Sequence, residues 1–221
     1  MKAPAEMKGR LWMHSTRAGR AYASGRYEAN VQQVLREYLT EGAVFWDVGA
    51  HVGFFSLFCL GIVGKSGRVI SFEPLIDNFE YLKRLWIING TLPEWSLHQA
   101  AVSDQRKVMN FAEGPTSTTG KLDTEGKTRV QCYRADDVWL AETRRDLTLV
   151  KVDVEGAAGG VLAGARQLLE SARPRLLVEI HAKEEARGVL SALPSCYDAK
   201  ELTDWEKGRS VHSQHFLLSA R

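Results

Sequence analysis

Four apolar runs alternate with helical segments along this chain, and that order restricts the fold more than any other feature of the sequence. The runs cover residues 43–48, 68–73, 147–154 and 175–180, and none of them alternates regularly between apolar and polar residues. Strands that are apolar on both faces are typical of parallel sheets with helices on both sides. We therefore expect an α/β fold with a doubly wound, mostly parallel sheet.

Helix signals fill the segments between these runs. Residues 31–39 carry apolar side chains at the spacing of one helix face. Residues 54–63 are apolar almost all round, which predicts a helix that is covered on several sides. Asp77 can cap a further helix that ends at Asn89, and one continuous helix is expected around residues 161–169.

Shorter strand patterns occupy the middle of the chain. Residues 96–102 predict a third strand, and residues 107–111 and 129–133 predict two short ones. Between these two lies a Gly/Thr/Ser-rich stretch, residues 114–126, without a core-forming pattern. We expect this stretch to be a loop or an insertion.

The two ends of the chain differ from its middle. Residues 196–202 and 215–219 are strand-like, and the polar stretch between them has no helix signal, so we expect an antiparallel hairpin at the sheet edge. Residues 1–26 are basic and have few regularly spaced apolar residues, which predicts an arm or lid outside the core. Its two readings, a surface extension or a substrate cover, stay open. Residues 27–221 are expected to form one domain.

Composition excludes several classes of protein. With 221 residues, 44% of them hydrophobic, the chain can form one core without metals or disulfides. The balance of 29 basic against 27 acidic residues is too even for charge alone to hold nucleic acid or a membrane surface. The three widely spaced cysteines and the absence of a signal-like or membrane-spanning run predict a cytoplasmic, unanchored protein.

Ligands of doubly wound sheets bind at the carboxyl ends of the strands, so the residues at those ends are the candidate site. The first strand ends in Asp47-x-Gly49-x-His51-x-Gly53, in which Gly49 permits a tight turn and Gly53 lets the helix begin close to the strand. The second strand ends at Glu73, whose carboxylate can accept hydrogen bonds from both hydroxyls of a ribose. Together these residues predict a cofactor that contains a nucleoside.

The turn after the first strand indicates which cofactor binds. A dinucleotide fingerprint needs G-x-G-x-x-G for the pyrophosphate, whereas this turn has His51 at the middle position and Asp47 just before it. Asp47 would repel a pyrophosphate and attract an ammonium group, so S-adenosylmethionine fits better than NAD. A capping role for Asp47 with a solvated Glu73, an NAD-dependent oxidoreductase, and a noncatalytic cofactor- or RNA-binding protein remain alternatives.

Five segments at successive strand ends resemble the motifs of one family. They are WDVGAHVGFFS at residues 46–56, SFEP at 71–74, AAVSD at 100–104, VKVDVEG at 150–156 and LVEIH at 177–181. With them the chain resembles the FkbM-type methyltransferases, class I enzymes that use S-adenosylmethionine and mostly methylate hydroxyls of natural products and sugars.

The resemblance implies a seven-stranded, Rossmann-like sheet with an antiparallel last strand. It also implies that Asp47, Gly49 and Gly53 hold the methionine end, that Glu73 binds the ribose, and that the adenine lies near Leu75, Val102 and Ser103. The predicted cofactor-binding set is Tyr27, Asp47, Gly49, His51, Gly53, Glu73, Leu75, Val102, Ser103 and Asp153. The expected partner is a small-molecule acceptor, and a homo-oligomer stays open.

Transfer of a methyl group to an alcohol needs a positioned acceptor and a group that takes its proton. Lys151, Asp153 and Glu155 alternate on one side of a strand, and His181 ends the neighbouring strand. The predicted bases are His181, Asp153 and Glu155, in order of suitability at neutral pH, with a structural histidine as the alternative. The same groups leave a divalent metal open without predicting one. The other histidines, His215 included, have no ligand spacing and are expected at the surface or an edge.

Overall fold

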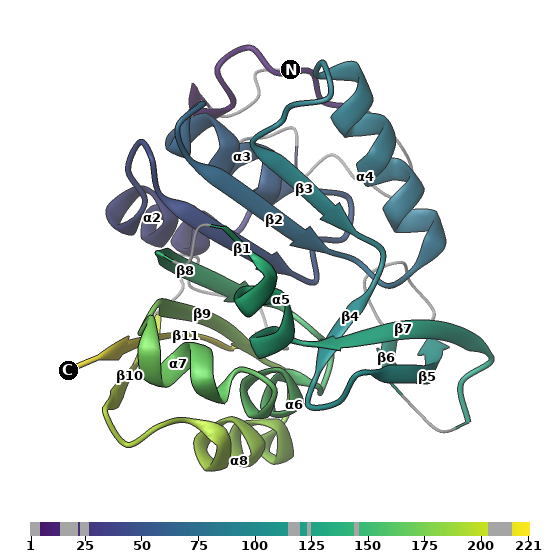
Figure 1. Ribbon diagram of the computed structural model, residues 1–221, viewed down its shortest axis with the longest axis vertical. Helices are drawn as coiled ribbons and strands as arrows, with labels where there is room; N and C mark the ends of the chain where they lie inside the picture. The colour runs from purple at the N-terminus through teal and green to yellow at the C-terminus, as the bar shows by residue number, and fades with distance from the viewer. Residues whose placement is uncertain are drawn as a thin grey trace, which may run out of the picture.

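A seven-stranded sheet forms the centre of the computed structural model, which describes residues 5–13, 22, 27–114, 120–122, 125–143, 146–202 and 214–221 (Figure 1). The strand order is β10-β11-β9-β8-β1-β2-β3, and within it β11 alone is antiparallel to its neighbours. The predicted doubly wound sheet with an antiparallel last strand is confirmed. The strands are β1 (Val44–Val48), β2 (Arg68–Phe72), β3 (Trp95–His98), β8 (Leu147–Val152), β9 (Arg175–Ile180), β10 (Tyr197–Leu202) and β11 (Gln214–Ala220).

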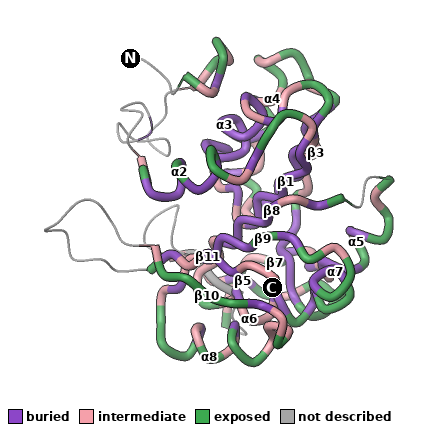
Figure 2. Tube along the Cα trace, turned by 90° about the vertical axis from the view of Figure 1, so that its left-hand side faces the viewer, coloured by how far each residue is buried: buried purple, intermediate pink, exposed green. Residues whose placement is uncertain are grey.

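Helices cover both faces of this sheet, and successive strand residues enter opposite cores. Phe45 packs with one group of helices and Trp46 with the other. The first group is α2 (Ala29–Tyr38), α3 (Phe54–Val63) and α4 (Ile76–Ile88); the second is α5 (Ala135–Ala141), α6 (Ala158–Ala163), α7 (Arg166–Ser171) and α8 (Lys183–Ala192). The central strands are buried, whereas β10 at the edge is largely exposed (Figure 2). None of these helices, as far as the chain is described, has the length and apolarity to cross a bilayer.

A second, smaller sheet has the order β4-β7-β5-β6. Its strands are β4 (Ala101–Ser103), β5 (Lys107–Glu113), β6 (Gly120–Leu122) and β7 (Thr128–Arg134). The prediction of one strand over residues 96–102 is wrong, because the chain turns after His98, where the Ala100 N–H donates to the His98 carbonyl at 2.9 Å. The expected loop at residues 114–126 contains β6, and its residues 115–119 and 123–124 lie outside the described residues.

The helix predicted around residues 161–169 is divided into α6 and α7. The division lies at Gly164, where a Cβ atom would come within 2.0 Å of the Ser103 carbonyl oxygen. From α5, the Asp136 carboxylate accepts the N–H groups of Gln167 and Leu168 at 3.2 and 2.9 Å, so it caps α7 from another element. The spacing of apolar residues in the sequence could not predict this contact, because Asp136 lies in another helix.

Two further helix predictions need correction. Asp77 does not cap α4, because the helix begins at Ile76 and its N-cap is Leu75. The sequence analysis also missed α5 and α8. Only Glu185 and Val189 of α8 are buried, so this helix has too few apolar positions for a periodic signal.

The tail hairpin forms as predicted, but only one of its strands lies at the edge. β11 is inserted between β9 and β10, and its Leu217 and Leu218 pack in opposite cores. This reversed strand therefore completes the sheet and brings its first residues next to the carboxyl end of β9.

The N-terminal segment packs against α3 and α4, and the expectation that it lies outside the core is wrong for two residues. The short helix η1 (Ala5–Met7) contacts α3, and Met7 is only 1% exposed. Tyr22 also belongs to the core cluster on this face of the sheet. Asn89 fastens the segment to the end of α4, because its side chain exchanges two hydrogen bonds with the Leu11 backbone.

Gly61 of α3 is expected to be essential for this docking. A Cβ atom at Gly61 would lie 1.4 Å from the Glu6 carbonyl oxygen, whereas one at Gly160 of α6 meets nothing within 4 Å. We expect Gly61→Ala to lower the free energy of unfolding by about 1–3 kcal/mol, as overpacking does. We expect Gly160→Ala, the matched control, to raise it by up to about 1 kcal/mol through helix propensity. Chemical denaturation measures both, and equal effects of the two variants would contradict the docking.

Candidate active site

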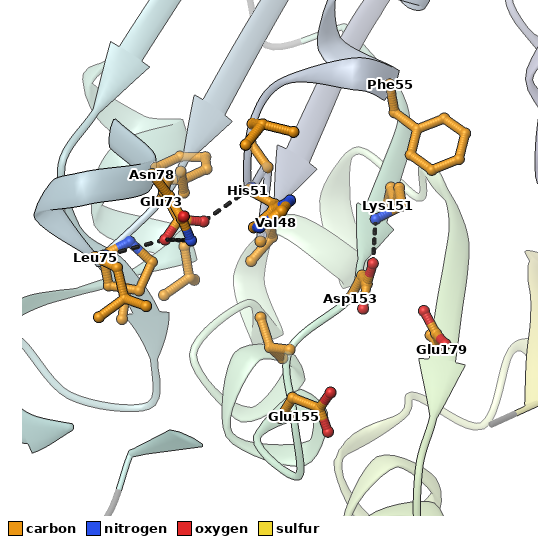
Figure 3. A pocket seen from close by; sticks show the side chains of 18 of the residues that line it. Val48, His51, Phe55, Glu73, Leu75, Asn78, Lys151, Asp153, Glu155 and Glu179 are labelled. Atoms are coloured by element: carbon orange, nitrogen blue, oxygen red, sulfur yellow. Dashed lines mark hydrogen bonds and ion pairs between the residues drawn. The ribbon is translucent and has the colours of Figure 1, made fainter. Parts of the chain in front are cut away.

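A cavity of about 330 Å³ opens at the carboxyl ends of β1, β2, β8 and β9. Figure 3 shows Glu73, Leu75 and Asn78 on one side of this cavity and Asp153, Glu155 and Glu179 on the other. The loop after β1, with His51, lies between the two groups. The cavity therefore connects the residues predicted to bind a nucleoside with the candidate catalytic residues. It lies at the position expected for a ligand of a doubly wound sheet.

The Gly49 turn brings two loops into direct backbone contact. Gly49 has a φ of 83°, and a Cβ atom there would lie 1.9 Å from the Asp153 carbonyl oxygen. The N–H groups of Gly49 and Ala50 both donate to the Phe72 carbonyl, at 3.0 and 2.9 Å. Any side chain at position 49 would separate the loops after β1 and β8.

A buried lysine connects the carboxylates at the ends of β1 and β8. Lys151 is 3% exposed, and its Nζ lies 2.8 Å from Asp153 Oδ2 and 3.9 Å from Asp47 Oδ1. Burial alone would lower the pKa of Lys151, but the carboxylates of Asp153 and Asp47 raise it above its ordinary value. Asp47, which also accepts a hydrogen bond from Ser56 at 2.5 Å, lies beneath the cavity and does not line it.

Glu73 lines the cavity with its carboxyl group already fixed by the protein. Oε2 accepts the His51 N–H at 2.9 Å, and Oε1 accepts the Leu75 N–H at 3.0 Å and the Asn78 side-chain amide at 3.3 Å. Of the roughly four lone-pair positions on a carboxylate, one on Oε2 is left for a ligand hydroxyl. Burial raises the pKa of Glu73 to about 7, against the effect of these hydrogen bonds.

His181 is surrounded by carboxylates. Its Nε2 lies 3.5 Å from Glu179 Oε1 and 3.8 Å from Glu155 Oε1, and its Nδ1 lies 3.4 Å from Glu185 Oε2. Burial opposes the charged form, but hydrogen bonds with Glu179 and Glu185 and their charges raise the pKa of His181 to about 10. The imidazole is therefore protonated at neutral pH.

Among the candidate bases, Asp153 has the proton affinity nearest neutrality. Burial raises the pKa of Asp153 to about 7. The Lys151 ammonium opposes this rise, while the charge of Glu179 and a hydrogen bond with it add to the rise. Burial also raises the pKa of Glu155, although less strongly.

Sequence reasoning missed Glu179 and His215 as site residues. The expectation that His215 lies at the surface or an edge is wrong, because β11 is an inner strand: His215 is 8% exposed, and its Nε2 lies 3.6 Å from Glu28 Oε2 and 3.5 Å from Glu179 Oε2. Glu179 stands two residues before His181, which directly follows β9, so the two-residue period of a strand could have indicated it. No sequence signal places His215, because its position depends on the insertion of β11.

The structure brings most of the predicted site residues together. Gly53 lies away from the cavity, where it begins α3 and a Cβ atom would come within 2.4 Å of Leu82. Ser103 is likewise turned away, since its hydroxyl exchanges hydrogen bonds with the Gln105 backbone. The predicted residues that line the cavity are Tyr27, Gly49, His51, Glu73, Leu75, Val102, Asp153, Glu155 and His181.

Within the part of the chain that the structure describes, two groups of side chains have residue types that could hold a metal ion. They are Glu28, Glu179 and His215, and Asp153, Glu179 and His181; within each, the donor atoms lie within 4.8 Å of one another. In both groups the carboxylates raise the pKa of the histidine to about 10, so an imidazolium already balances their charge. A metal ion would have to displace that proton, and we assign none.

Comparison with known proteins identifies the family. The sequence profile of the methyltransferase FkbM domain matches residues 47–209, about three quarters of the chain. This protein is an FkbM methyltransferase. The prediction made from the sequence motifs is therefore confirmed, and S-adenosylmethionine is the cofactor.

Individual relatives agree with this assignment. The hexuronic acid methyltransferase AglP of Haloferax volcanii is 29% identical over 181 residues, which are 80% of this chain and 72% of that protein. A crystal structure of an FkbM methyltransferase from Methylobacillus flagellatus has a TM-score of 0.56 at 16% identity, over 97% of this chain and 57% of that one. The structure of fibrillarin from Aeropyrum pernix with bound S-adenosylmethionine has a TM-score of 0.51 at 13% identity, over 86% of this chain and 73% of that one. These two structures support the fold.

The residues of this methyltransferase fit its cofactor. The turn after β1 lines the cavity with Gly49 and His51, so a ligand in the cavity lies next to the main chain of this turn. Glu73 keeps one acceptor position for a hydroxyl. Leu75, Ala101, Val102 and Phe111 form an apolar part of the cavity wall that suits a purine ring.

Removal of the Glu73 carboxylate is expected to weaken cofactor binding. We expect Glu73→Ala to raise the Kd for S-adenosylhomocysteine at least about tenfold, because hydrogen bonds to a charged group contribute about 1.5–3 kcal/mol. Glu80→Ala removes an exposed carboxylate from α4 and serves as the control. Calorimetric titration measures both, and an unchanged Kd for Glu73→Ala would contradict the assignment.

Binding of S-adenosylhomocysteine is also expected to weaken as the pH falls. A hydroxyl donor binds the ionised carboxylate, and the pKa of Glu73 is about 7, so acid converts Glu73 to the weaker acceptor. We expect up to about a tenfold loss of affinity from pH 8 to pH 6, and a smaller loss in Glu73→Gln. The difference between the two profiles of affinity against pH gives the part of the pH dependence that comes from ionisation of Glu73. Identical profiles would contradict a role for its ionisation.

Proposed function

We propose that this FkbM methyltransferase transfers a methyl group to an oxygen atom of a sugar or a related hydroxylated natural product. The observation that carries the proposal is the carboxyl group of Asp153, which lines the cavity opposite Glu73 and has a pKa of about 7. An acid of this pKa can take a proton from an alcohol during transfer near neutral pH. The hexuronic acid methyltransferase relative supports an acceptor of the sugar class.

We place the cofactor across the cavity from Glu73 to Asp153. Glu73 takes a ribose hydroxyl, the Gly49 and His51 turn accommodates the methionine part, and Leu75 and Val102 border the adenine. Asp47 then acts indirectly, because Lys151 separates it from the cavity and holds Asp153 in place. The carboxylates at this end of the sheet also favour the positive sulfonium.

The methyl acceptor then lies beside Asp153, Glu155 and Glu179. The acceptor oxygen forms a bond to the methyl carbon while the carbon–sulfur bond breaks, and the electron pair of that bond stays on sulfur. The acceptor proton moves to the Asp153 carboxylate. His181 keeps its own proton throughout, because both of its ring nitrogens face carboxylates, and Asp153 replaces it as the first candidate for the base.

The N-terminal segment serves as a cover for this site. Tyr22 and Tyr27 line the cavity with their rings 4.3 Å apart, and the Tyr22 hydroxyl lies 3.4 Å from His51 Nδ1. Both rings also pack on Phe54 at the start of α3. Ordered aromatic side chains at this position exclude water from the methyl group and offer a face to a sugar ring.

Asp153→Asn is expected to lower the rate of methyl transfer while it leaves cofactor binding nearly unchanged. The amide keeps the size of the side chain but cannot accept the proton, so we expect methyl transfer to fall at least about a hundredfold. Cofactor affinity should stay within a few-fold, because Glu73 and the Gly49 turn remain. The assay uses labelled S-adenosylmethionine with a panel of neutral sugars, uronic acids and other polyols.

The chemical nature of the product tests the oxygen assignment. An ether formed at a hydroxyl survives mild alkali, whereas an ester formed at a uronic acid carboxylate releases methanol. We expect the unaltered protein to form ether products, and we expect their rate of formation to fall in Asp153→Asn. A full rate in Asp153→Asn with a hydroxyl acceptor, or methylation only at nitrogen or carbon, would contradict the proposal.

A further inference from the structure

The carboxyl group of Asp153 has a second carboxylate, Glu179, as its neighbour across the cavity. Figure 3 shows the two side chains side by side at the ends of β8 and β9. Oxygen atoms of the two carboxyl groups lie within 4.8 Å of each other, so a negative charge on one raises the proton affinity of the other. The groups that hold Glu179 therefore also affect Asp153.

Two imidazolium groups hold Glu179, one on each of its oxygens. Oε1 lies 3.5 Å from His181 Nε2, and Oε2 lies 3.5 Å from His215 Nε2. His181 directly follows β9, the strand of Glu179, whereas His215 belongs to the reversed strand β11, where it is the register partner of Glu179. Burial opposes ionisation of Glu179, but hydrogen bonds and charges of both histidines lower its pKa far below its ordinary value.

We propose that Glu179 is a positioning residue that, fixed between His181 and His215, turns the Asp153 carboxyl toward the acceptor and raises its affinity for the acceptor proton. This inference rests on the proposed function, in which Asp153 takes the acceptor proton. Glu179 stays ionised, so its negative charge raises the proton affinity of Asp153, and His215 limits that effect from the other side. The reversed strand thus contributes to the chemistry as well as to the sheet.

Several other groups surround Asp153 and act on it in every variant. Lys151 shares its strand and attracts the ionised form, and Glu155 follows in the same loop. Among the described residues, the other ionisable groups near Asp153 are Asp47 of β1, Glu28 next to α2, His181 directly after β9, and the phenols of Tyr22 and Tyr27. Because these groups are unchanged in both variants, a substitution at Glu179 or His215 reports the effect of that residue alone.

Substitutions at the two residues are expected to move the titration of Asp153 in opposite directions. Glu179→Gln removes a negative charge beside Asp153, so the midpoint should fall by about one pH unit or more. His215→Gln removes a positive charge, so the midpoint should rise. A residue that only supports the fold would produce neither shift.

The test is a titration of the Asp153 side-chain carboxyl by NMR. The protein is labelled with ¹³C at aspartate, bound to S-adenosylhomocysteine, and the resonance is assigned with Asp153→Asn. Glu179→Asp, which keeps the charge, should restore the midpoint toward that of the unaltered protein. His98→Gln is the control, because His98 lies on the edge strand β3 and does not line the cavity.

Opposite shifts in Glu179→Gln and His215→Gln, with none in His98→Gln, would establish the positioning role. Midpoints that stay within about 0.2 pH units in both variants while S-adenosylhomocysteine still binds would overturn it. The measurement needs no methyl acceptor, so its result is independent of the proposed function. A failure of that function would instead appear as Asp153→Asn with a full rate of methyl transfer.

Discussion

The ion pairs of Lys151 are the interaction on which the rest of the site depends. An ammonium group that is 3% exposed costs several kcal/mol to bury unless carboxylates compensate it, and Asp153 and Asp47 supply that compensation. The pairing fixes the end of β8 against the end of β1, where Gly49 and the Asp153 carbonyl already touch. The two loops that line the cavity and the acid that we propose as the base are therefore parts of one packed unit.

From this unit, a series of ionisable groups extends across the carboxyl end of the sheet. Lys151 pairs with Asp153, Glu179 lies next to Asp153, and His181 and His215 face Glu179 on both sides. Each charge in the series would be unfavourable if it were buried alone. Together they keep one carboxyl group at a proton affinity near neutrality while its neighbours stay charged. The methyl acceptor and the sulfonium of the cofactor thus meet a site whose charges are already ordered.

Local sequence signals predicted the central fold and several residues that line the cavity. Apolar runs without alternation gave the parallel sheet, and the strand ends placed Gly49 and Glu73, because both directly follow their strands in the sequence. Asp47, which was predicted with them, lies beneath the cavity instead. Long-range contacts explain the misses: Asp136 caps α7 from 31 and 32 residues away, and His215 reaches Glu179 through an inserted strand. The protonated state of His181 could not be predicted from the sequence either, because three carboxylates from separate parts of the chain surround its imidazole and raise its pKa. Neighbouring residues in the sequence do not specify such contacts.

A crystal structure with S-adenosylhomocysteine would test the central claim most directly, namely that one cavity joins a cofactor held at Glu73 to a base at Asp153. The account predicts a ribose hydroxyl within hydrogen-bond distance of Glu73 Oε2, the adenine against Leu75 and Val102, and the thioether sulfur facing Asp153. A cofactor bound with its sulfur turned away from Asp153, or with its ribose away from Glu73, would contradict it.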